Sequence, residues 1–86
     1  MSYSLAKLKA LADETRLNIL LLLLKSELPV QEIVDHIKKS QPNISIALKK
    51  MEHAGLIISR KEGKNVYYSI ENKTTIQKIL ELVKDE

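Results

Sequence analysis

Apolar positions recur every three or four residues over most of this chain, which is the period of an α-helix. The pattern predicts a first helix over Ser4–Leu11 and a second over Asp13–Lys25, with the aspartate as its N-cap. Residues 19–24 are six consecutive apolar residues, so we expect the second helix to be central and contacted from several directions. Pro29 suits the start of a third helix, predicted over Val30–Lys39.

The next helix, predicted over 40–54, is the most informative segment because its period separates two unlike faces. Ser40 can cap it, and Gly55 suits the position just past its end. One face is the apolar stripe Ile44, Ala47, Leu48 and Met51. The other face combines hydrogen-bonding groups, one aliphatic side chain and cations: Gln41, Pro42, Asn43, Ser45, Ile46, Lys49 and Lys50. Base edges and phosphates are recognised by that mixture, whereas a solvated helix face is usually plain Glu and Lys.

After this helix the period becomes that of an extended chain. The runs 56–60 and 66–70 are rich in β-branched and aromatic residues, and Glu62–Asn65 supplies a turn, so a hairpin is predicted. Thr74–Gln77 then matches a capping box, which predicts that a fifth helix opens there. The apolar stripe of this last helix is Ile76, Ile79, Leu80 and Val83.

The resulting order is four helices, a hairpin and a helix. It predicts a single domain spanning 1–86, mainly α in an α+β fold. The very short Lys39–Ser40 connection forces the third and fourth helices to cross at a large angle, as in a helix-turn-helix, and the hairpin would then be a wing. The same order also fits a small α+β domain with no nucleic-acid role.

Charge distribution favours the nucleic-acid alternative. The net charge is only +3, yet the basic residues concentrate in the middle of the chain: Lys38, Lys39, Lys49, Lys50, Arg60, Lys61 and Lys64. A local basic patch on a near-neutral domain is typical of a nucleic-acid binder, although a merely solvated lysine-rich surface is the alternative. Because the chain has 86 residues and no cysteine, oligomerisation is the expected additional source of stability.

Several kinds of chemistry are not expected. No Ser/His/Asp set, glycine-rich phosphate loop or carboxylate pair stands out, so we expect neither an enzyme nor a cofactor. His36 and His53 are isolated, so no metal site is expected, while a pH effect of either histidine stays open. We also expect no membrane contact and a cytoplasmic location, because no signal peptide or membrane-spanning run is visible.

The sequence resembles the arsenic-repressor (ArsR/SmtB) family of winged-helix transcription regulators over nearly its whole length. Residues 11–20, LADETRLNIL, look like the family's opening signature, and 40–48 look like its recognition helix. Residues 54–57 and 60–68 look like the helix end and the wing. The resemblance implies a homodimer that binds a palindromic operator and represses transcription until a signal releases it.

Two departures from the family pattern concern the signal and the DNA sequence. Residues 28–32 carry no cysteine and residues 74–86 carry no histidine, so both common metal-sensing sites are expected to be absent and the effector is unknown. Ile46 and Ala47 replace a basic or histidine pair that many members have after the helix serine. The contacts with bases must therefore differ.

The candidate roles follow from side-chain chemistry. Gln41 and Asn43 can bind adenine, Ser45 a base or phosphate, and Ile46 a thymine methyl group or, alternatively, another protein. The helix lysines suit phosphates, and Arg60, Lys61 and Lys64 flank the hairpin tip, where they follow the DNA backbone, enter the minor groove or are merely solvated.

The first and last helices are the expected dimer surface, through Leu5, Leu8, Ile76, Ile79, Leu80 and Val83. The alternative is that these helices only close the protomer core. Two-fold symmetry would place the two recognition helices about 34 Å apart, one turn of DNA. A winged-helix module that mainly binds another protein is the second functional hypothesis.

Overall fold

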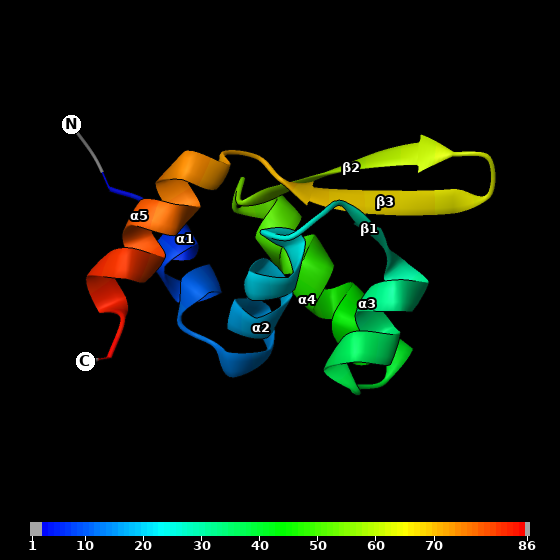
Figure 1. Ribbon diagram of the computed structural model, residues 1–86, viewed down its shortest axis with the longest axis horizontal. Coiled ribbons are helices and arrows are strands. Elements are labelled where there is room, and N and C mark those ends of the chain that lie inside the picture. The colour runs from blue at the N-terminus through cyan, green and yellow to red at the C-terminus, as the bar shows by residue number, and fades with distance from the viewer. Residues whose placement is uncertain (1–2, 86) are drawn as a thin grey trace.

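The protein is described by a computed structural model that covers residues 3–85. Within this range the chain forms five helices and three strands (Figure 1), in an order that confirms the predicted winged helix-turn-helix. The elements are α1 (Leu5–Leu11), α2 (Glu14–Leu23), β1 (Leu28–Pro29), α3 (Val30–Ile37), α4 (Gln41–His53), β2 (Ile57–Glu62), β3 (Asn65–Ile70) and α5 (Lys73–Val83).

The core forms where α2 meets α3, α4 and the sheet. Ile19, Leu20 and Leu23 of α2 are fully buried, as is Ile33 of α3, so the central position predicted for α2 is confirmed. Leu21 is the exception in the apolar run, because its side chain is exposed. Burial of side chains on three sides of one helix supplies the main stabilisation of a domain this small.

Local capping chemistry fixes the start of α2 and both ends of α4 as predicted, whereas α2 ends at Leu23 rather than Lys25. Asp13 accepts a hydrogen bond from the backbone N–H of Arg16 at 3.0 Å, and Ser40 accepts one from Asn43 at 3.3 Å. Gly55 has φ +79°, and the N–H groups of Gly55 and Leu56 donate to the carbonyls of Glu52 and Met51. This pair of hydrogen bonds is a Schellman motif, which ends α4 and starts the turn into β2.

Two further predicted helix boundaries were wrong. The third helix ends at Ile37 rather than Lys39, because Lys38 adopts the left-handed conformation with φ 61° and so turns the chain sharply into α4. The last helix does not open at a Thr74 cap. Asn72 is the N-cap, and its side-chain oxygen accepts from the backbone N–H of Thr75 at 3.1 Å. Asparagine is among the best capping residues, so it takes this position two residues earlier.

The three strands form an antiparallel sheet in the order β1-β3-β2. The hairpin is confirmed, with Glu62 opposite Asn65 and a two-residue loop of Gly63 and Lys64. The positive φ of Gly63 is the mark of a type II′ turn, which suits the twist of the strands. The two-residue strand β1 was not predicted; Leu28 pairs with Tyr68 of β3 and thereby ties the start of α3 to the base of the wing.

The arrangement separates two ends of the molecule. The β2–β3 hairpin projects as an arm from one end, whereas α1 and α5 lie together at the other end (Figure 1). The longest dimension is 39 Å. No helix within residues 3–85 has the length and apolar character that crossing a bilayer requires.

Candidate nucleic-acid interface

The two faces predicted for α4 are present. Its inner stripe, with Ile44, Leu48 and Met51 fully buried, holds the helix against α2 and α3. On the outer face the side chains are exposed, except for the half-buried Ser45: Gln41, Pro42, Asn43, Ile46, Lys49 and Lys50. Ile46 is 56% exposed, so its aliphatic side chain is available for a contact outside the protomer. The helix is thus anchored on one side and offers hydrogen-bonding, apolar and cationic groups on the other.

Lys38, Lys39 and Ser40 form the turn between α3 and α4. Both lysines are exposed, and the left-handed backbone of Lys38 sets the angle at which α4 leaves α3. Ser40 uses its hydroxyl oxygen to cap α4. The turn therefore places two cations beside the N-terminus of α4, where the helix dipole also favours an anion.

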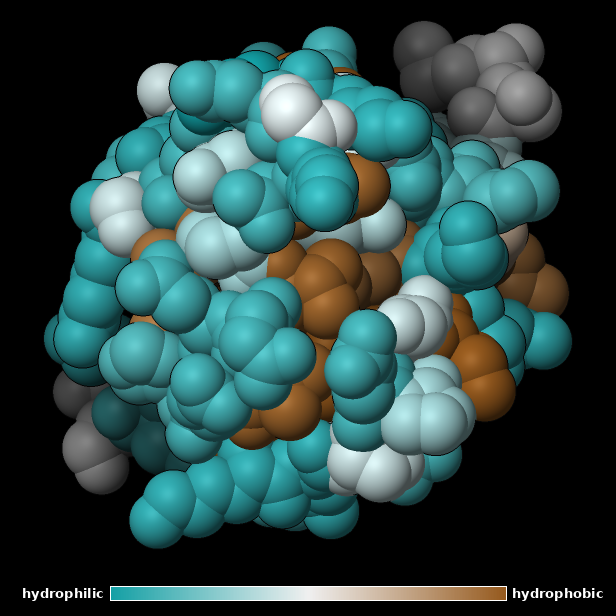
Figure 2. Space-filling model, turned by 90° about the vertical axis from the view of Figure 1, so that its right-hand side faces the viewer, coloured by the Kyte–Doolittle hydropathy of each residue, from teal (hydrophilic) through white to brown (hydrophobic). Residues whose placement is uncertain are grey.

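The wing carries Lys61 near the end of β2 and Lys64 in the turn, both exposed. Figure 2 looks onto the end of the molecule from which the wing projects, and hydrophilic side chains cover most of that view, with a smaller apolar area near its middle. The structure thus brings two of the three predicted wing cations to the outer part of the hairpin.

Arg60 is placed differently from the other wing cations. It lies in mid-strand opposite Tyr67, with its guanidinium 4.7 Å from the ring centroid, and it pairs with Glu27 at 2.7 Å and Glu62 at 2.5 Å. The hydrogen bonds from Arg60 lower the pKa of Glu27 below its ordinary value of 4.5. The charge of Arg60 is therefore engaged within the protomer, and Glu27, which sequence reasoning missed, connects the chain before β1 to the wing.

A second connection joins the wing to the recognition helix. The Ser59 hydroxyl on β2 donates to Glu52 of α4 at 2.8 Å. Next to this contact, Tyr68 is buried, and burial, followed by the charge of Glu52, raises the pKa of its phenol. Glu52 was also missed by sequence reasoning, because no local pattern links a helix end to a strand that follows a glycine turn.

The predicted dimer stripe is divided by the structure. Ile76 is only 3% exposed and belongs to the protomer core, and Ile79 and Leu80 are half-buried. In contrast, Leu5 and Leu8 of α1 are each 61% exposed and Val83 of α5 is 63% exposed. Ile76 therefore closes the protomer core, which was the alternative to a role in the dimer interface. The exposed apolar surface extends to two residues that were not predicted, Tyr3 and Leu82.

The two histidines lie apart. His36 of α3 has its Nδ1 atom 2.8 Å from the carbonyl oxygen of Glu32, and His53 lies at the exposed end of α4. Among residues 3–85 the structure brings no three His, Asp or Glu side chains together in a way that would hold a metal ion.

Comparisons with known proteins give this geometry a context. The family model for "Bacterial regulatory protein, arsR family" matches residues 13–59. The transcriptional activator HlyU of Vibrio cholerae is 38% identical over 76 residues, which are 88% of this chain and 69% of that protein. A solved HlyU structure has a TM-score of 0.81 at 35% identity, covering 93% of this chain and 90% of that one.

Two further relatives are similar over shorter or more distant matches. The arsenical resistance operon repressor of Escherichia coli is 46% identical over 63 residues, which are 72% of this chain and 54% of that protein. The solution structure of Mb0332 from Mycobacterium bovis, described as a homodimeric winged helix-turn-helix DNA-binding domain, has a TM-score of 0.77 at 28% identity, covering 94% of this chain and 84% of that one.

The family match runs from the cap of α2, through the two-faced helix α4, to the start of the wing, and so covers more than half of the chain. The chain belongs to the arsR family of bacterial regulatory proteins and is a winged helix-turn-helix transcriptional regulator that binds DNA.

Proposed function

We propose that two copies of this chain bind a palindromic operator and repress transcription. The observation that carries the proposal is the outer face of α4, where exposed amide, aliphatic and cationic side chains and a half-buried hydroxyl stand on a helix whose inner stripe is buried. Such a helix fits the major groove, which displays a distinct pattern of donors, acceptors and methyl groups for each base pair.

Each side chain has a proposed role in that complex. Gln41 and Asn43 bind adenine edges, and Ser45 binds a base or a phosphate. Ile46 packs on a thymine methyl group, and Pro42 shapes the first turn of α4. The cations that grip phosphates are Lys38, Lys39, Lys49, Lys50, Lys61 and Lys64. Arg60 holds the wing through Glu27 and so acts on DNA mainly by positioning Lys61 and Lys64 on the backbone or in the minor groove.

The two copies associate through the exposed outer edge of α1 and α5. Leu5, Leu8 and Val83 offer apolar surface that a solitary soluble domain would leave open to water, and half-buried Ile79 and Leu80 adjoin it. This end of the protomer is opposite the wing, so pairing there leaves both recognition helices available (Figure 1). The homodimeric state of Mb0332 supports the association of two copies.

Salt-dependent binding of a fluorescent duplex, chosen by in vitro selection with the purified chain, tests this function. Each neutralised phosphate contributes about 0.9 to the slope of log affinity against log salt concentration. Lys61→Gln removes one contact per protomer, so the slope of a dimer should fall by about 1.8. Lys78→Gln, an exposed substitution on α5, is the matched control and should leave the slope unchanged. A salt-independent affinity, or binding by single protomers, would refute the proposal.

A further inference from the structure

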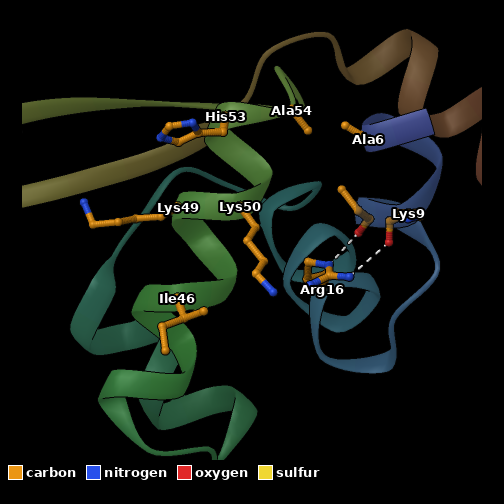
Figure 3. Close-up of a pocket in the computed structure, with 9 residues that line it drawn as sticks. Ala6, Lys9, Arg16, Ile46, Lys49, Lys50, His53 and Ala54 are labelled. Carbon is orange, nitrogen blue, oxygen red and sulfur yellow. Dashed lines mark hydrogen bonds between the residues drawn. The ribbon is translucent and has the colours of Figure 1, made fainter. Parts of the chain in front are cut away.

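A hollow of about 700 Å³ lies beside the recognition helix, between α4, α1 and the start of α2 (Figure 3). Its floor is made by the small side chains Ala6, Ala10 and Ala54, and Ile46 forms one wall. Binding sites for small molecules in proteins have volumes of about 300–1,000 Å³ and mostly apolar linings. The hollow matches that range in volume and lining, and it is an open groove in which Ala6 and Ile46 are exposed.

The rim of the hollow is cationic. Lys9, Arg16, Lys49 and Lys50 line it and no acidic residue does. Within residues 3–85 the ion pairs that the structure contains all belong to Arg60, so none of these four cations is neutralised by a carboxylate. Lys50 extends from α4 toward Arg16 of α2 (Figure 3). Two like charges facing each other across an open space attract an anion between them.

Arg16 is already fixed in position for such a contact. Its Nε donates to the carbonyl of Ala10 at 2.8 Å and its Nη2 to the carbonyl of Lys9 at 3.0 Å, as the dashed lines in Figure 3 show. A guanidinium has five N–H donors, so others remain for a carboxylate. Because these two bonds hold the side chain before any ligand arrives, little conformational entropy is lost on binding.

We propose that this hollow binds a small amphipathic carboxylate. Its head lies between Arg16 and Lys50, and its short aliphatic body covers the alanine floor. A bare DNA phosphate would satisfy the cations but leave the apolar floor open to water, so the combination of charge and floor favours a ligand with both parts.

The ligand and DNA exclude each other, an inference that rests on the proposed function. Ile46, Lys49 and Lys50 belong both to this hollow and to the face of α4 that we assign to DNA. For competing ligands, a carboxylate present at ten times its dissociation constant weakens DNA binding by about 11-fold per protomer. The hollow is therefore an effector site, and its occupation releases the operator.

The first test titrates the 86-residue chain with octanoate in the absence of DNA and follows the backbone amide NMR shifts. Saturable shifts should gather at Ala6, Ala10, Ile46 and Ala54, while acetate and octan-1-ol should each bind at least tenfold more weakly. Lys50→Gln should weaken octanoate binding and Lys78→Gln should not. Absence of saturable shifts at these amides overturns the proposal. Equal binding of octan-1-ol overturns the role of charge, and equal binding of acetate overturns the role of the floor.

The second test adds octanoate to a preformed complex with the selected duplex and follows fluorescence anisotropy. Wild type should release DNA at the octanoate concentrations that saturate the NMR shifts. Ala6→Leu, which fills the floor without removing a charge, should bind DNA normally but resist release. Octanoate binding without DNA release would overturn the effector role. Failure of wild type to bind DNA would refute the proposed function, while the NMR titration would still decide whether the hollow binds a carboxylate.

Discussion

Truncation of Ile46 to alanine tests whether the exposed aliphatic side chain on α4 reads the DNA sequence. The change removes three carbon groups, each worth about 0.8 kcal/mol on full burial. Ile46 is 56% exposed in the free protein, so only that fraction of the burial energy is gained on binding DNA. The alanine variant therefore loses about 1.3 kcal/mol of binding free energy. That amount corresponds to roughly tenfold weaker binding per half-site, or about 100-fold for a symmetric operator.

The assay compares the affinity for the selected duplex with that for a scrambled duplex at one fixed salt concentration. Binding to scrambled DNA should be nearly unchanged, because phosphate contacts dominate it. Ile58→Ala is the matched control: Ile58 is 48% exposed on β2 and has no assigned contact, so its truncation should leave both affinities as they are. Equal losses of Ile46→Ala on the two duplexes would refute a base contact.

Three other predictions concern stability, titration and assembly. Lys38→Gly should raise the free energy of unfolding by about 1 kcal/mol, measured by denaturant melts, because glycine tolerates the left-handed φ of 61° that costs a lysine about that much. The Glu27 carboxyl should titrate below 4.5 by NMR and return to about 4.5 in Arg60→Gln. Since the folded-state pKa is the lower one, the stabilisation from this pair is present above pH 4.5 and is lost as the pH falls through the folded value. Val83→Glu should shift sedimentation toward the protomer, whereas Leu21→Glu, on an exposed site of α2, should not; unchanged sedimentation of both variants would count against the α1–α5 dimer.

The parts of the fold that sequence predicted well are those decided by neighbouring residues. Helix capping is such a case: Asp13 and Ser40 accept hydrogen bonds from N–H groups in the first turn, and Gly55 ends α4. Each of these bonds joins residues at most four positions apart, so the sequence alone predicts it. The strand β1 is the opposite case. Leu28 becomes extended structure through its pairing with Tyr68, and no pattern in the two residues of β1 indicates that partner.

The same distinction applies to the candidate site. The exposed face of α4 follows from helical period alone, and the structure confirms it. Arg60 could not be placed in that way, because its partner Glu27 is 33 residues away. Ile76 shows a second limit, since a helical stripe gives the direction of its apolar residues but not which of them the protomer itself covers. Sequence reasoning missed the cationic hollow because its cations are far apart in the chain. Arg16 and Lys50 line the same hollow only because α2 packs beside α4.

In the proposed DNA complex, the paired cation Arg60 and the unpaired lysines have different roles. Arg60 is held by Glu27, and Ser59 is held by Glu52, so the base of the wing is fixed to both α4 and the chain before β1. Since the free protein already holds the wing at a set angle to the recognition helix, little ordering entropy opposes binding. The lysines of the turn, α4 and the wing tip carry no ion pair within residues 3–85, so in the proposed complex they would meet the phosphates without first giving up a carboxylate. Because Arg60 is paired with two carboxylates, this group contributes no positive charge to the surface, and its positive potential comes from the lysines of the turn, α4 and the wing tip.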